Sequence, residues 1–337
     1  MLESMSEADV PALPSYAELP VRDGLPKGSS WELWGESDRL GCLNLLSPAG
    51  ARRGAGCVRS GNVFPLNLEL ELPDPPLFGR PAFGHEIVQR PSGVSADDML
   101  HGFNTQSSSQ WDGFRHVRNA VHGAYNGLPE AEHGIHHWAR RGIVGRGVLA
   151  DVARWRESQG RPVKAGTTDI ITPNDLTETL RAQNIVVEPG DILLVRTGWV
   201  AFYRSLNTTE RTDYAARPTA VGFEPSESMA ACLWDLHISA VGCDNPAVEA
   251  WPPPMYTMSA EDRASAMERS GDPDVSAGLF LHLNLLPLLG LPLGELFDLD
   301  ALADECNRTR TYECLVTSSP LNLLHGVATP PNIMAIC

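Results

Sequence analysis

The segment QSSSQWDGFRH at 106–116 carries an aspartate and a histidine four residues apart. Carboxylate oxygen and imidazole nitrogen together suit a hard or borderline divalent cation. Asp112 and His116 flank a glycine-containing turn, which would let both side chains point to one site. The pattern is short and also occurs by chance, so it predicts a metal site only if distant ligands can be named. The alternative is a polar surface loop.

Two further candidate ligands lie far along the chain, each inside an apolar run. His282 lies in LFLHLNLL and Glu295 lies in GLPLGELFDL. A histidine and a carboxylate in such surroundings cost free energy unless hydrogen-bond partners or a metal ion satisfy them. The alternatives are a hydrogen-bonded core histidine and an ordinary glutamate at the start of a helix. The residues alone leave both readings open.

Other catalytic motifs do not occur in the sequence. It has no GxSxG nucleophile turn, no P-loop lysine and no GxGxxG following a predicted strand. The serines at 107–109 could include a nucleophile, but no base stands at a recognised spacing from them. Metal chemistry is therefore the leading hypothesis from the motifs.

The elements that must position these residues alternate between strands and helices after about residue 145. Apolar runs predict strands and amphipathic patterns predict helices. We expect strands at 66–71, within 146–155, at 192–199, 238–244 and 311–318, helices at 172–183 and 226–237, and a strand, short turn and helix start at 279–303. Residues 73–93 are rich in proline and glycine and predict an irregular connection. This order favours a mixed α/β fold.

Composition and charge exclude several functional classes. The formal net charge is −16 and the basic residues are scattered, which argues against a nucleic-acid partner. No apolar run approaches the ~18–20 residues of a membrane span. The acidic start of the chain lacks the features of a signal peptide, so we expect a cytoplasmic protein. Residues 1–30 predict a proline-containing N-terminal arm that precedes the main domain.

The segment at 106–116 and several longer blocks resemble the cyclase or kynurenine-formamidase-like metal-dependent hydrolases, which include isatin hydrolases. The family signature H-x-G-T-H-x-D-x-P-x-H aligns with Gln106 to His116, so that Asp112 and His116 fall on its aspartate and last histidine. Gln106 and Gln110 fall on its first two histidines. Similar blocks are RGVLADV at 146–152, EPGDILLVRTGW at 188–199, AVGCDNPAVE at 240–249, LHLNLLPLLGLPLGELFDLDAL at 281–302 and the ending PLNLLHGVATPPNIMAI.

The resemblance implies a swivelling β/β/α cyclase-like single domain over residues 31–337, with a mixed sheet and peripheral helices. It also implies a homo-oligomer, a dimer or tetramer. The ion ligands that it implies here are Asp112, His116, His282 and Glu295. A carboxamide oxygen is a weaker ligand than an imidazole, so the replacements at 106 and 110 leave the family's first ion site without two ligands. We expect at most one tightly held divalent ion, zinc or manganese.

These observations together predict a hydrolase that cleaves a C–N or C–O bond of a cyclic or aryl amide or lactone with metal-activated water. The predicted catalytic residues are His116, Glu295 and Asp112. The residues expected to contact the small-molecule substrate are Gln106, Gln110, Trp111 and Tyr125, although Trp111 could equally be a core residue. One alternative is a metal-poor lyase, dehydratase or cyclase in which His116 and Asp112 act as acid and base. Another is a non-catalytic protein that binds a small molecule.

Overall fold

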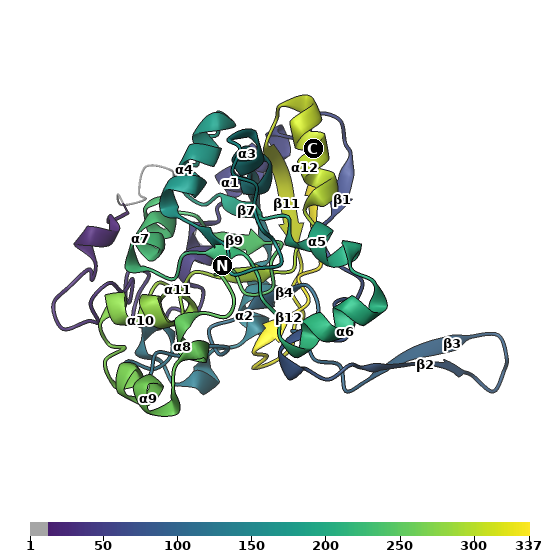
Figure 1. Ribbon diagram of the computed structural model, residues 1–337, viewed down its shortest axis with the longest axis horizontal. Coiled ribbons are helices and arrows are strands. Elements are labelled where there is room, and N and C mark those ends of the chain that lie inside the picture. Colours follow the sequence, from purple (N-terminus) through teal and green to yellow (C-terminus); the bar gives the residue numbers. More distant parts are fainter. Residues whose placement is uncertain (1–12) are drawn as a thin grey trace.

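A nine-stranded mixed sheet forms the centre of the protein (Figure 1). The computed structural model describes residues 13–337, so the first twelve residues of the predicted arm lie outside the described residues. The strand order is β1-β13-β11-β5-β7-β9-β10-β4-β12. The middle strands run parallel: β5 (Ile143–Asp151), β7 (Ile192–Arg196), β9 (Ala240–Cys243) and β10 (Leu293–Glu295). They are almost entirely buried, which explains their continuous apolar sequences.

Antiparallel strands extend this parallel centre on both sides. They are β1 (Val63–Pro65), β4 (Gln110–Asp112), β11 (Glu313–Ser318), β12 (Ala328–Thr329) and β13 (Ile333–Ile336). Two smaller pairs lie outside the main sheet: a parallel pair, β6 (Ile170–Ile171) with β8 (Gly222–Phe223), and an antiparallel hairpin, β2 (Gly84–Gln89) with β3 (Ala96–His101).

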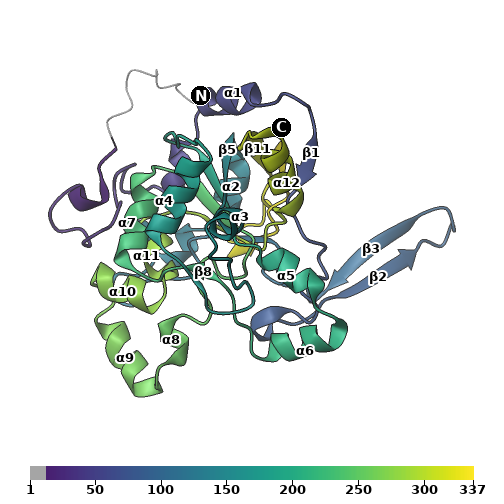
Figure 2. The same ribbon diagram turned by 45° about the horizontal axis from the view of Figure 1, so that its top comes forward.

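Helices surround the sheet at its periphery (Figures 1 and 2). They are α1 (Pro48–Gly56), α2 (Ile135–Arg141), α3 (Val152–Ser158), α4 (Pro173–Ala182), α5 (Trp199–Ser205), α6 (Thr208–Ala216), α7 (Glu227–Asp235), α8 (Pro254–Thr257), α9 (Ala260–Glu268), α10 (Pro273–Leu279), α11 (His282–Leu285) and α12 (Asp300–Thr309). Short 3₁₀ helices occur at Tyr16–Glu18, Gly41–Leu45, Leu77–Gly79, Tyr125–Gly127 and Glu130–Glu132. In the part of the chain that the structure describes, none of the helices has the length and apolar character to cross a membrane.

The predicted mixed α/β fold, with one large sheet and peripheral helices, is confirmed. Helix α4 begins where its sequence predicts, because the Thr172 hydroxyl accepts a hydrogen bond from the backbone N–H of Asp175 and the Asp175 carboxylate accepts one from the backbone N–H of Thr172. Helix α7 begins after Ser226, whose hydroxyl accepts a hydrogen bond from the backbone N–H of Met229. Strands β5, β7, β9 and β11 occupy the predicted runs.

Three predictions of local structure were wrong. The alternation at 66–71 is real, since Leu66 and Leu68 are buried, but the segment pairs only through a single bridge at Asn67, and the strand precedes it at β1. The apolar run expected to form a strand at the start of 279–303 is instead helix α11, because burial on every side removes the periodicity that distinguishes the two. Residues 73–93 were expected to be irregular throughout, but strand β2 (Gly84–Gln89) lies within them.

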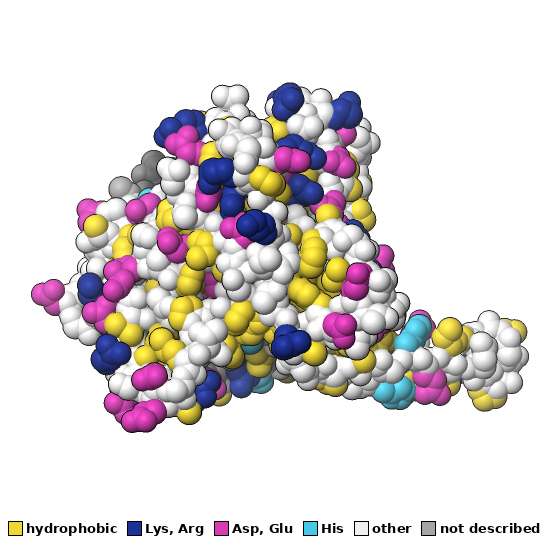
Figure 3. Space-filling view, viewed as in Figure 1, with side chains coloured by type: hydrophobic (Ala, Val, Ile, Leu, Met, Phe, Trp, Pro, Cys, Tyr) yellow, Lys and Arg dark blue, Asp and Glu magenta, His cyan; other side chains and the backbone are white. Residues whose placement is uncertain are grey.

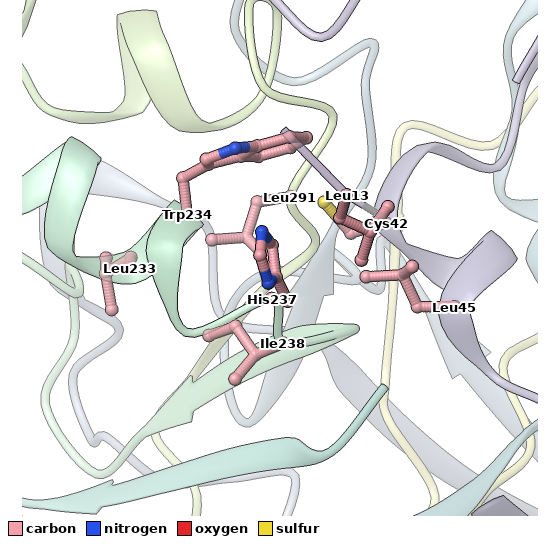
Figure 4. Close-up of a pocket in the computed structure, with 8 residues that line it drawn as sticks. All are labelled: Leu13, Cys42, Leu45, Leu233, Trp234, His237, Ile238 and Leu291. Atoms are coloured by element: carbon pink, nitrogen blue, oxygen red, sulfur yellow. The ribbon is translucent and has the colours of Figure 1, made fainter. Parts of the chain in front are cut away.

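The first described residues of the chain pack against α7. The indole N–H of Trp234 donates to the carbonyl of Pro14 over 2.8 Å, and the backbone N–H of Tyr16 donates to Asp235 over 2.7 Å. A small pocket lies at this contact, lined by apolar side chains and His237 (Figure 4). Its volume of about 10 Å³ holds at most one water molecule, so it is a gap in packing rather than a ligand site.

Candidate metal centre

The pairing of β4 with β10 brings together residues that are far apart in the sequence. Glu295 stands directly opposite Gln110 in this antiparallel pair, and Leu293 stands opposite Asp112. Side chains alternate along a strand, so Gln110 and Asp112 share one face of β4. The amide nitrogen of Gln110 donates to Glu295 Oε2 over 2.5 Å. The short strand β4 therefore presents the middle of the segment 106–116 to Glu295.

Two histidines complete the cluster from other elements. His282, on α11, is buried, and its Nε2 lies 3.2 Å from Glu295 Oε1 and 3.9 Å from Asp112 Oδ2. His116 lies in the turn after β4, and its Nε2 is 3.8 Å from Asp112 Oδ2. Ligand atoms of Asp112, His116 and His282 all lie within 4.8 Å of one another. Three of the four predicted metal ligands thus form a compact group, with Glu295 beside it.

The pKa values of the two buried carboxylates in the cluster are shifted in opposite directions. Burial raises the pKa of Glu295, and the negative charge of Asp112 adds to this, so that it reaches about 7. Burial also opposes ionisation of Asp112, but the neighbouring His116 and His282 outweigh it and lower its pKa to about 2. Burial lowers the pKa of His116. The pair Asp112 and Glu295 therefore combines one ionised carboxylate with one that titrates near neutrality.

These donors fit one divalent cation. Two imidazoles and a carboxylate are a ligand set that zinc and manganese accept, and a fourth position can be left for water or substrate. The side chains of His282 and Asp112 are almost completely buried, whereas a quarter of the His116 side chain is exposed. An ion held by these residues would be reached from the His116 side.

The two glutamines of the signature act as hydrogen-bond donors. Gln106 Nε2 donates to Asp112 Oδ1 over 2.7 Å, and the amide nitrogen of Gln110 donates to Glu295. The guanidinium of Arg80 donates to the backbone oxygen of Gln106 and, over 3.4 Å, to Gln110 Oε1. Arg80 thus occupies the amide oxygen of Gln110 and leaves its nitrogen facing the carboxylates. Arg80 was not predicted, since nothing distinguishes it within a segment rich in proline and glycine.

Two residues predicted to contact substrate are not brought to this cluster. Trp111 projects from the opposite face of β4, is fully buried, and donates from its indole nitrogen to Ser318 over 3.0 Å. Tyr125 is also fully buried; its hydroxyl donates to Asp38 over 3.0 Å and its ring packs against Phe114. Both side chains belong to the core in this structure.

A different set of aromatic rings leads from the cluster to the surface. Phe280 stacks on the imidazole of His282, with ring centroids 4.4 Å apart and planes 7° apart. The ring centroid of Tyr256 lies 5.8 Å from that of Phe280, and the ring centroid of Trp251 lies 4.7 Å from that of Tyr256. Phe78 packs on Trp251 at 4.5 Å. The sequence analysis missed these rings, because they come from segments that are adjacent only in the folded chain.

Glu249 is a second residue that sequence reasoning missed. Its carboxylate is fully buried and lies 2.8 Å from His282 Nδ1. A signal existed, because Glu249 is an acidic residue in the mainly apolar stretch PAVEAW. This is the reasoning that singled out Glu295.

Comparisons with known proteins identify the family and the fold. The family model described as Putative cyclase matches residues 63–250. A solved structure of a novel cyclase is 25% identical, covers 92% of this chain and 99% of its own, and has a TM-score of 0.76. Isatin hydrolase A from Labrenzia aggregata, bound to benzyl benzoate, is 17% identical, with coverage of 83% and 94% and a TM-score of 0.53.

An isatin hydrolase bound to the product analogue thioisatinate is 14% identical, with coverage of 87% of this chain and 99% of its own and a TM-score of 0.51. At these identities the isatin hydrolases show a common fold. Among curated proteins, no sequence matches this one significantly. Since the family model matches more than half of its 337 residues, this chain belongs to the Putative cyclase family.

Proposed function

We propose that this protein is a hydrolase that uses one divalent ion, zinc or manganese, to open a cyclic or aryl amide or lactone. The observation that carries the proposal is the group formed by Asp112, His116 and His282, whose ligand atoms lie within 4.8 Å of one another. The common fold with isatin hydrolases supports the choice of reaction.

Asp112, His116 and His282 would hold the ion in this reaction. A bound divalent ion polarises the substrate carbonyl and lowers the pKa of water towards ~7. Glu295 lies 3.2 Å from His282 and, with a pKa of about 7, can accept a proton and pass it to the leaving nitrogen or oxygen. The amide nitrogens of Gln106 and Gln110 hold the two carboxylates in place by donating to them.

The aromatic rings beside the cluster support a flat substrate. Phe280 stacks on His282, the half-exposed Tyr256 packs against Phe280, and Trp251 packs against Tyr256. Aromatic faces bind planar rings by offset or edge-to-face packing. An aryl group placed along this series would bring its amide or lactone carbonyl towards His116 and Asp112.

A metal-poor lyase, dehydratase or cyclase is the second candidate. It is favoured by the hydrogen bonds that Gln106 and Gln110 donate to Asp112 and Glu295, since these partly balance the buried negative charge without an ion. In this candidate His116 and Asp112, whose Nε2 and Oδ2 atoms lie 3.8 Å apart, would act as acid and base. This candidate predicts turnover that chelators do not affect.

We also propose that the protein forms a homo-oligomer in which the β2–β3 hairpin contacts a second copy. The hairpin projects from the body (Figures 1 and 3) and nearly all its residues are exposed. Ile87, Met99 and Leu100 are 62%, 46% and 43% exposed. An isolated two-stranded hairpin is marginally stable in water, so packing against a neighbour would stabilise it. Light scattering of the protein with residues 84–101 replaced by a short Gly-Ser linker tests this: a monomer is expected, and an unchanged oligomer would refute it.

Activity and metal content should be measured together to test the hydrolase. Protein purified without added metal is analysed for zinc and manganese and assayed against isatin, aryl formamides and aryl lactones. We expect activity that is lost on chelation and restored by adding the ion. His116→Ala should abolish both the activity and the metal binding. His137→Ala, on α2, is the matched control and should retain both. Full activity of His116→Ala, or turnover in metal-free protein, would overturn the proposal.

A further inference from the structure

A buried carboxylate contacts His282 from the side opposite to the candidate ion. The two oxygens of Glu249 lie 2.8 and 3.0 Å from His282 Nδ1, while His282 Nε2 faces Asp112 and Glu295. We infer that Glu249 is a positioning residue that fixes the tautomer and ring orientation of His282, so that Nε2 is free to bind the ion. The inference rests on the proposed function and deepens it.

The contact between Glu249 and His282 is specific. Glu249 is fully buried and His282 is 1% exposed. Within residues 13–337, the imidazole Nδ1 is the only donor that hydrogen-bonds to the Glu249 carboxylate. A buried carboxylate without a partner is strongly destabilising, so its placement here needs the imidazole N–H. Glu249 and His282 therefore form a specific hydrogen-bonded pair.

The backbone around Glu249 is arranged to deliver its side chain. Val248 has a positive φ of 49°, which a β-branched residue rarely adopts. The side chain of Asn245 holds this turn by donating to the carbonyls of Val248 and Val221 over 3.1 and 2.7 Å. A Cβ at residue 222 would lie 2.1 Å from the carbonyl carbon of Glu249. Only glycine therefore allows the backbone at 222 to lie this close to the backbone of Glu249. Strain of this kind persists only where surrounding contacts enforce it.

The imidazole ring is fixed by two contacts at right angles. Phe280 stacks on its face, with planes 7° apart, and Glu249 accepts from its edge. A proton held on Nδ1 leaves the Nε2 lone pair for an ion. A carboxylate in this position also makes the imidazole a stronger ligand, and removing such partners typically lowers metal affinity about 10–100-fold. Glu249 thus acts through His282 and touches neither ion nor substrate.

Metal affinity measured by chelator competition tests the inference on the full-length protein. Wild type, Glu249→Gln and Glu249→Leu are stripped of metal and titrated with Zn²⁺ and Mn²⁺. We expect Glu249→Gln to weaken binding about tenfold and Glu249→Leu about 100-fold. In zinc-loaded protein labelled with ¹⁵N-histidine, wild type should show a slowly exchanging, downfield-shifted Nδ1–H proton for His282, as expected for a hydrogen bond to a carboxylate. In Glu249→Leu this proton should shift upfield or exchange rapidly with water.

Asp244→Asn is the matched control. Asp244 is a fully buried carboxylate of the same loop, but its partners are the N–H and hydroxyl of Thr197 and the N–H of Gly198. Its replacement should lower stability and leave metal affinity unchanged. Glu249 variants that are folded by circular dichroism and bind zinc as tightly as wild type would overturn the inference, as would an equal loss in Asp244→Asn. Failure of wild type itself to bind an ion would refute the proposed function and this inference together.

Discussion

The unusual pKa of Glu295 predicts how the stability of metal-free protein depends on pH. Its ordinary pKa of 4.5 is raised to about 7, first by burial and then by the charge of Asp112. The folded state therefore favours the protonated carboxyl. Stabilisation from this group is complete below pH 4.5 and is lost as the pH rises through about 7. The difference between these two pKa values corresponds to about 3 kcal/mol in the free energy of unfolding.

Glu295→Gln isolates this effect, because a neutral amide resembles the protonated carboxyl in size and polarity. Urea unfolding of metal-free wild type and variant should give similar free energies at about pH 4.5, and by about pH 8 the variant should be the more stable by about 3 kcal/mol. Other ionisable groups titrate in both proteins and largely cancel in the difference. A difference that does not change with pH would show that Glu295 ionises normally and would refute the reasoning.

Three further changes test the site and the residues that support it. Gly222→Ala places a Cβ 2.1 Å from the Glu249 backbone and should lower the free energy of unfolding by about 1–3 kcal/mol in urea; an unchanged midpoint would contradict this. The double variant Gln106→His and Gln110→His restores two imidazoles beside Asp112 and should raise bound zinc from one to two equivalents by elemental analysis, whereas one equivalent would contradict it. Arg80→Met frees the amide of Gln110 and should lower kcat/KM about tenfold, as expected for loss of a charged hydrogen bond; an unchanged value would contradict it.

The sequence identified the cluster because its members are chemically unusual where they occur. His282 and Glu295 are polar groups in apolar runs, and Asp112 and His116 share one short segment. Helix α4 was predictable because the residues that cap it are adjacent to it in the sequence. These features depend on local composition, which a sequence displays directly.

Features that depend on contacts between distant segments could not be predicted. The run containing His282 was expected to be a strand, since a fully buried helix and a fully buried strand have the same composition. The sequence left Trp111 open as either a substrate contact or a core residue, and only the alternation of side chains along β4 turns it to the face opposite Gln110 and Asp112. Arg80 reaches the site through a turn that has no sequence signature.

The central claim is that Asp112, His116 and His282 hold one divalent ion. Crystals grown with zinc and measured at the zinc absorption edge test it most directly. A single strong anomalous peak at about 2.0–2.2 Å from one atom of each of these three side chains is the predicted result. A peak bound elsewhere, or no peak in crystals of protein that turns over normally, would contradict it.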